Sequence, residues 1–135
     1  ISLYVSCQYL MKFSEKEIEE MKKFVKHLNS KKDSVVIVEG KCDSIALRKL
    51  GFSGKILEFH SFKGIVIFSD SVAKYKNIIL LLDGDRKGRY LTKRIIKLLE
   101  HRTKIDLSFK KKLISITKGK IRFIEQLVCY EPYVV

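Results

Sequence analysis

Short apolar segments rich in β-branched residues alternate with helical patterns along most of the chain, and this alternation admits one class of fold. The apolar segments span residues 35–38, 55–59 and 78–82. Apolar residues recur every three or four positions, as in amphipathic helices, within 45–50, 65–75 and 89–101. Strands that alternate with helices predict a parallel sheet with right-handed crossovers. We therefore expect an α/β fold with a mostly parallel sheet of about four strands, the last at 104–107, and helices on both faces.

The sequences before and after this alternating region predict helical additions to a single domain. Ser14 and Glu17 have the spacing of a capping box, which predicts a helix that ends near Asn29. Residues 1–10 are either an upstream extension or an edge strand. We expect three parts: an N-terminal extension and bracing helix at 1–33, the core at 34–107, and a helical tail packed on the core at 108–135. The whole chain has 135 residues, a length typical of one domain.

Acidic turns directly follow two of the apolar segments. A Glu-Gly-Lys-Cys-Asp turn occupies 39–43, and an Asp-Gly-Asp turn occupies 83–85. Each sequence by itself is more often an ordinary turn than a site. In an open parallel sheet, however, ligands bind beyond the carboxyl ends of the strands, where both turns would lie. Together they predict a site in which Glu39, Asp83 and Asp85 converge.

A divalent cation is the ligand that such a cluster of carboxylates favours. Two carboxylates about 4 Å apart repel one another by several kcal/mol at a protein-like dielectric of ~20, and a bound cation offsets this repulsion. Oxygen-only ligands suit Mg²⁺ or Mn²⁺ and not zinc. A calcium-binding EF-hand is excluded, because Lys87 and Arg94 occupy positions where that loop needs oxygen ligands.

Positive charge is concentrated in the second part of the chain. Lys and Arg number 28 against 15 Asp and Glu, and residues 59–135 carry +10 of the net charge of +13. An excess of this size favours polyanionic partners, nucleic acid first and an anionic membrane second. A charged helix face is often only a solvated face, but cations beside an acidic metal site suit a phosphodiester backbone. The candidate phosphate-binding residues are Lys41, Arg86, Lys87, Arg89, Lys93 and Lys97.

A second run of cations has no acid among its residues and includes Lys110, Lys111 and Lys112. Aromatic residues that could stack on bases include Tyr75, Tyr90 and Phe109, but they form no recognised RNA-binding signature. We interpret most of the aromatic residues as core.

The three cysteines are odd in number, widely spaced and without a CxxC pair. This pattern argues against a disulfide framework and against a zinc site, and it favours a cytoplasmic location. The first ten residues are too few to cross a bilayer. We expect no membrane partner, because the chain lacks a basic amphipathic helix with exposed large apolar residues.

The two acidic motifs together resemble one known family. Val-Val-Ile-Val-Glu-Gly-x-x-Asp at 35–43, followed by Ile-Ile-Leu-Leu-Leu-Asp-Gly-Asp-x-x-Gly at 78–88, is similar to the Toprim domain of bacterial-type primases, topoisomerases, ribosomal-RNA maturation nucleases and OLD-family nucleases. The similarity covers about 34–107, and the whole chain looks most like the small stand-alone Toprim proteins of archaea and bacteria. Its supporting motif residues are Gly40, Asp43, Gly84 and Gly88.

The resemblance implies a three-layer Rossmann-like fold and assigns roles to the acids. Glu39 would act in acid-base chemistry or metal binding, while Asp83 and Asp85 would hold Mg²⁺. Topoisomerase members often carry a further acid inside the second motif, where this chain has Arg86 and Lys87. That departure argues against a second tightly bound metal ion and against topoisomerase activity.

The functional expectation is a Mg²⁺-dependent phosphoryl-transfer domain that acts on DNA or RNA, with a nuclease as the first choice. A second reading is a binding or regulatory module that grips phosphate without turnover. A third is a primase-like component of a larger complex, because 135 residues leave no room for the other parts of a complete primase. A homodimer and a larger nucleic-acid-processing complex both remain open.

Overall fold

A four-stranded parallel sheet lies at the centre of the computed structural model, which describes residues 12–135. The strands are β1 (Ser34–Val38), β2 (Lys55–Glu58), β3 (Asn77–Leu80) and β4 (Lys104–Asp106). They lie in the order β2-β1-β3-β4, and each neighbouring pair is parallel. The expected α/β class and the sheet of four strands are thus confirmed, with β1 and β3 as the central pair.

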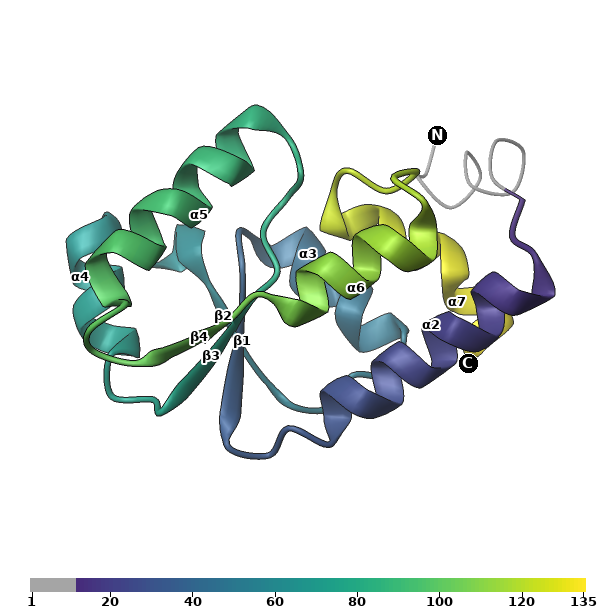
Figure 1. Ribbon diagram of the computed structural model, residues 1–135, viewed down its shortest axis with the longest axis horizontal. Helices are drawn as coiled ribbons and strands as arrows, with labels where there is room; N and C mark the ends of the chain where they lie inside the picture. The colour runs from purple at the N-terminus through teal and green to yellow at the C-terminus, as the bar shows by residue number, and fades with distance from the viewer. Residues whose placement is uncertain (1–11) are drawn as a thin grey trace.

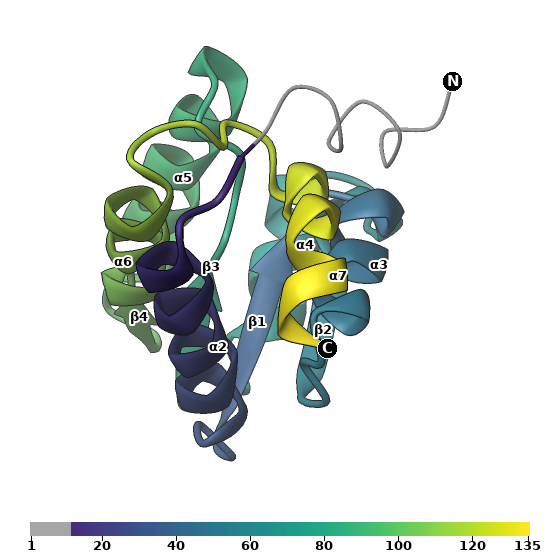
Figure 2. The ribbon, with the colours of Figure 1, turned by 90° about the vertical axis from the view of Figure 1, so that its right-hand side faces the viewer.

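Helices cover both faces of this sheet and form the two outer layers. The helices are α2 (Glu15–Asn29), α3 (Lys41–Lys49), α4 (Ile65–Val72), α5 (Arg86–Leu99), α6 (Ser108–Thr117) and α7 (Glu131–Val134), with 3₁₀ helices η1 (Phe59–Ser61) and η2 (Ile124–Tyr130). Helices α4 and α5 lie on one face, while α2, α3, α6 and the C-terminal segment lie on the other (Figures 1 and 2). This is the three-layer arrangement that the family resemblance implies.

The strand sequences explain why the sheet is buried on both faces. Successive side chains of a strand point to opposite faces. Val36 and Val38 accordingly pack in a core with α2, α3 and α6, whereas Val35 and Ile37 pack in a second core with α4 and α5. All four side chains are almost completely buried. A strand between two helical layers therefore needs a continuous apolar run, which β1 has.

Several element boundaries differ from the sequence predictions by a few residues, and two of these differences have a clear cause. Strand β2 ends at Glu58, one residue earlier than expected, because the chain turns into η1 at Phe59. Helix α5 begins at Arg86 and not near Arg89, because the Asp85 side chain caps the helix by accepting the N–H of Gly88 at 2.7 Å. The two readings of residues 1–10 lie outside the described residues.

A buried carboxylate connects the N-terminal helix to the C-terminal segment. Glu17, 5% exposed, accepts hydrogen bonds from Lys120 Nζ at 2.8 Å and from the Tyr130 hydroxyl. Burial, together with this bond to Glu17, raises the pKa of Tyr130 and keeps its hydroxyl protonated. Polar contacts thus join α2 to the C-terminal segment in addition to apolar packing.

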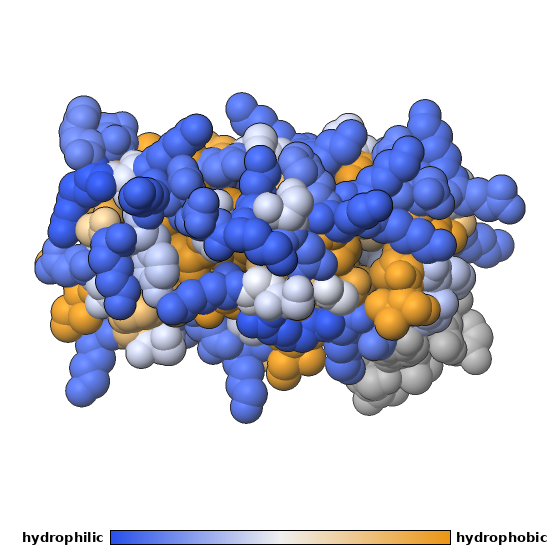
Figure 3. Space-filling view, turned by 90° about the horizontal axis from the view of Figure 1, so that it is seen from below, coloured by the Kyte–Doolittle hydropathy of each residue, from blue (hydrophilic) through white to orange (hydrophobic). Residues whose placement is uncertain are grey.

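Within residues 12–135, no helix is long and apolar enough to span a membrane. The face drawn in Figure 3 is mostly hydrophilic, with smaller apolar areas between the polar side chains. Among the cysteines at described positions, Cys42 is exposed and free, and Cys129 is buried. The cytoplasmic location stays a prediction.

Candidate functional site

The candidate site lies at the carboxyl ends of β1 and β3, where the two acidic turns meet. The two strands pair in register from Ser34 with Asn77 to Ile37 with Leu80, and the Leu81 N–H donates to the Ile37 carbonyl beyond them. Glu39 follows β1 directly, and its Oε2 accepts the backbone N–H of Asp83 at 3.0 Å. The structure therefore brings Glu39 and Asp83 together, as the sequence indicates.

The environment of Glu39 favours its protonated form. Burial is the largest cause, and it raises the pKa of Glu39 from 4.5 to about 7. The hydrogen bond from the Asp83 N–H lowers the pKa of Glu39, whereas the carboxyl groups of Asp83 and Asp43 raise it further. The side chain is only 8% exposed. A carboxyl group with a pKa near neutrality is suited to taking up and releasing a proton at physiological pH.

Asp43 combines a capping role with a place in the acidic cluster. Its Oδ2 accepts the N–H of Gly40 at 3.1 Å, at the start of α3. Burial raises its pKa, the Gly40 N–H opposes that rise, and the negative charges of Asp83 and Glu125 add to it. Asp43 therefore both fixes the 39–43 turn and adds negative charge near Glu39.

Asp85 is engaged differently from the other two predicted ligands. Its carboxylate accepts the Gly88 N–H and its carbonyl accepts the Arg89 N–H, so it is the N-cap of α5. Gly88 is required at this point, since a Cβ there would lie 2.1 Å from the Asp83 carbonyl oxygen. The second motif thus packs the first turn of α5 tightly against the Asp83 backbone.

Lys110, on α6, is a cation close to this acidic cluster, although the sequence indicated it only as part of a second run of cations. A Cβ on Gly84 would lie 3.9 Å from its Nζ. Burial lowers the pKa of Lys110, and the charges of Asp83, Glu39, Asp43 and Asp85, in decreasing order, oppose that change. Helical spacing puts Lys110 on the same face as Leu113 and Thr117, which lie three and seven residues later and are both buried, but this spacing does not reveal that the face lies by the acids.

The C-terminal segment holds the Asp83 turn through its backbone. The Ile124 N–H donates to Asp83 Oδ1 at 2.8 Å, and the Gly84 N–H donates to the Arg122 carbonyl at 2.6 Å. The tail thus forms part of the site in addition to packing on the sheet. No side-chain pattern in the sequence predicted this contact.

Among the predicted phosphate-binding cations, Lys41 lies at the start of α3 and Arg86, Lys87 and Arg89 lie in the first turn of α5, next to the acidic turns, whereas Lys93 and Lys97 lie further along α5, with Lys97 in its last turn. On α5, the side chains of Arg86, Lys87, Arg89, Lys93 and Lys97 are exposed, and Lys41 is exposed at the start of α3. Lys87 also lines a hollow of about 310 Å³ beside Glu39, together with His60 and Tyr90. The His60 backbone N–H donates to the Glu39 carbonyl at 2.8 Å, so this exposed histidine adjoins the site.

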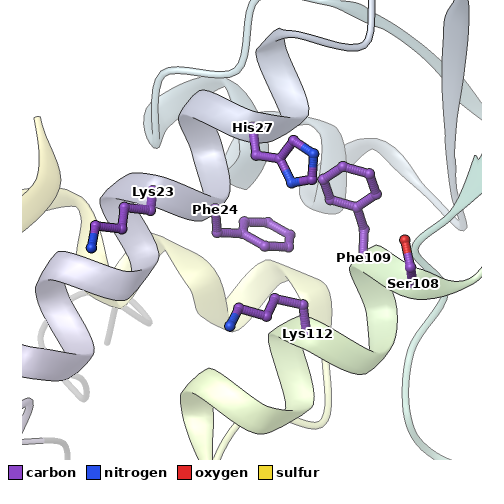
Figure 4. Close-up of a pocket in the computed structure, with 6 residues that line it drawn as sticks. All are labelled: Lys23, Phe24, His27, Ser108, Phe109 and Lys112. Atoms are coloured by element: carbon purple, nitrogen blue, oxygen red, sulfur yellow. The ribbon is translucent and has the colours of Figure 1, made fainter.

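A second hollow, of about 390 Å³, contains none of the predicted site residues. It lies between α2 and α6, where the rings of His27 and Phe109 approach to 4.8 Å (Figure 4). Phe24 and Phe109 belong to the buried core, and the polar side chains at the opening are exposed lysines and Ser108. No carboxylate lines this hollow, so it is not a candidate for the acidic, cation-binding site.

Comparison with known proteins identifies the family. Residues 34–125 match the Toprim domain, and the chain belongs to that family. Its relatives include UPF0292 proteins, small stand-alone Toprim proteins. One from Thermococcus sibiricus is 34% identical over 96 residues, covering 70% of this chain and 75% of the relative. Another, from Methanosarcina acetivorans, is 32% identical over 119 residues, covering 85% and 82%.

A solved structure of a protein from Aquifex aeolicus has the same fold. It superposes with a TM-score of 0.60 at 24% identity, covering 86% of this chain and 99% of that one. The family match continues past the core expected at 34–107 and takes in α6 and the segment that contacts Asp83.

Toprim proteins generally bind Mg²⁺, and the donor atoms of this site suit that ion. Glu39 and Asp83 offer oxygen only, and each carboxylate has about four acceptor positions. One N–H bond to each leaves room for a cation. Within residues 12–135, no three His, Cys, Asp or Glu side chains are already grouped as a metal cage. Glu39 and Asp83 are thus the first candidates to hold Mg²⁺, and Asp85 would join them by sharing its capping oxygens.

Proposed function

We propose that this chain is a Mg²⁺- or Mn²⁺-dependent nuclease that acts on phosphodiesters of DNA or RNA. The observation that carries the proposal is the Glu39–Asp83 pair, in which a buried carboxyl group with a pKa near 7 lies against a second carboxylate. Asp83 and Asp85 would hold the ion, and Glu39 would hold it or accept a proton. When bound, the ion would polarise the phosphate and lower the pKa of a coordinated water molecule.

The other side chains have roles that follow from their charge and position. Glu39 is poised to accept the proton of an attacking water molecule, because at neutral pH a large fraction of it is ionised. Lys41, Arg86, Lys87 and Arg89 are exposed and would hold the phosphodiester backbone. Lys110 would limit the repulsion between the clustered acids and the incoming phosphate.

The test is cleavage of single- and double-stranded DNA and RNA with Mg²⁺, with Mn²⁺ and with a chelator. Cleavage by the wild-type chain should depend on the metal and be lost in the double variant Asp83→Asn with Asp85→Asn. Asparagine keeps an acceptor for Ile124 and for Gly88, so the fold is retained. Asp33→Asn, at an exposed position, is the matched control. Cleavage that survives in the double variant would refute the assignment.

Two observations favour a second function, a phosphate-binding module without turnover. Asp85 is already engaged as a helix cap, and Lys110 already compensates the acidic cluster. Such a module would bind nucleic acid in the absence of metal, with an affinity that falls steeply with salt, and would cleave nothing. The same assays therefore separate the two functions.

A further inference from the structure

The hollow beside Glu39 combines aromatic and cationic side chains in a way that the acidic site alone does not explain. It lies between η1, the start of α4 and α5, and has a volume of about 310 Å³. This is near the lower end of the range for small-ligand pockets, which suits a single nucleotide. Glu39 lines it as well, so an occupant would lie directly against the proposed site.

Its aromatic wall is built from a fixed ring and an exposed one. Phe59 is held by an edge contact to the buried Phe68, at 5.1 Å between ring centroids. Tyr90, on α5, is 56% exposed, although an aromatic ring of this kind gains free energy when it is covered. Both rings line the hollow. Rings arranged in this way offer a surface on which an unpaired base can stack.

The cations of the hollow lie on the same helix as Tyr90. Lys87 and Arg94 line it, and the Arg94 guanidinium carbon lies 5.9 Å from the Tyr90 ring centroid. That distance permits a cation–π contact, which holds a positive charge beside the ring. A ligand with a flat apolar part and a flanking negative charge complements this arrangement, and a nucleotide has both.

We propose that this hollow receives one unpaired nucleotide of a single-stranded nucleic acid. Its base stacks on Tyr90 and Phe59, its phosphate contacts Lys87 and Arg94, and the neighbouring phosphodiester reaches Glu39. The inference rests on the proposed function and specifies its substrate class. A base within a duplex would first have to leave its stack and its partner, which costs free energy, so single strands and unpaired ends are preferred.

Binding measured in a chelator tests this substrate class separately from cleavage. Fluorescence anisotropy with short single-stranded and duplex oligonucleotides should show tighter binding of the single strand. Tyr90→Ala should weaken single-strand binding by about 5- to 150-fold, the range measured for loss of one stacked base. Tyr90→Phe should retain the affinity. Tyr133→Ala, at a partly exposed tyrosine on α7, is the control and should change nothing.

Other results of these experiments would overturn either this inference or the nuclease proposal. Equal affinity of Tyr90→Ala and the wild-type chain, or equal affinity for duplex and single strand, would overturn this inference and leave the nuclease proposal standing. A free mononucleotide that displaces the strand at the strand's own dissociation constant would show that the hollow serves free nucleotides and would overturn it too. If the wild-type chain binds the single strand but shows no metal-dependent cleavage, the nuclease proposal is refuted and this inference is retained.

Discussion

Glu39 and Asp83 are 44 residues apart in sequence, yet the Asp83 backbone N–H lies 3.0 Å from a carboxylate oxygen of Glu39. The bond joins the ends of the two central strands and fixes the Glu39 side chain in a buried position. It also places two acids side by side. Proton affinity, metal affinity and stability of the chain are therefore coupled at this point.

Stability should fall as the pH rises through the titration of Glu39. The folded chain binds this proton with a pKa of about 7, against an ordinary value of 4.5. Between these pH values the folded state holds more protons than the unfolded state, so the contribution of Glu39 to stability declines with pH and is flat above about 7. Glu39→Gln should thus unfold at a higher temperature than the wild-type chain at about pH 8.

The advantage of Glu39→Gln should be of the order of 1–3 kcal/mol at about pH 8 and shrink towards about pH 4.5. Differential scanning fluorimetry in a chelator across this pH range measures it. Glu19→Gln, on the exposed side of α2, should show no such trend. An advantage that is constant with pH would contradict the assigned environment of Glu39.

Divalent metal should bind and stabilise the wild-type chain, and Asp83→Asn should weaken this binding. Asparagine still accepts the Ile124 N–H but removes one negative charge from the acidic pair. We expect affinity for Mn²⁺ to fall about tenfold or more, because the Coulomb attraction at a partly buried site is several kcal/mol. Isothermal titration calorimetry measures the affinity, and Asp70→Asn, at an exposed position, is the control. Undiminished Mn²⁺ affinity would remove Asp83 from the ligand set.

Replacement of Lys110 should raise the metal affinity of the site, which is the opposite of the effect expected for Asp83→Asn. Lys110→Met removes a partly buried positive charge, so the carboxylates repel one another more in the absence of metal and attract a cation more strongly. We expect a lower unfolding temperature in a chelator and a several-fold higher affinity for Mg²⁺. Lys111→Met, the exposed neighbour on α6, should change neither quantity. Equal Mg²⁺ affinity in the two variants would show that Lys110 has no electrostatic role.

Two glycines of the second motif should differ in their tolerance of alanine. A Cβ at position 88 would overlap the Asp83 carbonyl, at 2.1 Å, so Gly88→Ala forces the backbone apart. A Cβ at Gly84 would come no closer than 3.4 Å to the Arg122 carbonyl oxygen. Gly88→Ala should cost about 1–3 kcal/mol of unfolding free energy, and Gly84→Ala clearly less. Urea denaturation compares them, and equal losses would contradict the close approach at Gly88.

The sequence predicted those features of the site that depend on local patterns and on the general geometry of parallel sheets. Glu39 and Asp83 were expected to meet because both follow apolar strands, and the structure confirms that β1 and β3 are neighbours. The capping role of Asp85 was missed, because the Asp-Gly-Asp sequence at 83–85 suits a turn and the start of a helix equally well. Its bond to Gly88 decides between the two.

Features that depend on distant parts of the chain were not predicted. Lys110 was one cation among several, and only the packing of α6 places it by the acids. Tyr90 was named as one of several aromatic residues that could stack on bases, but its 56% exposure depends on how α5 packs and could not be predicted. Ile124 contributes a backbone N–H, which leaves no trace in residue types.

That backbone contact bears on how such a site changes as sequences diverge. Position 124 supplies an amide hydrogen and position 122 a carbonyl, which any residue provides at 122 and any residue except proline provides at 124. These two contacts therefore set no requirement on residue type beyond the exclusion of proline at 124, so residue types alone do not reveal that the tail holds the Asp83 turn. At these two positions the contact depends on the path of the main chain and not on the side chains.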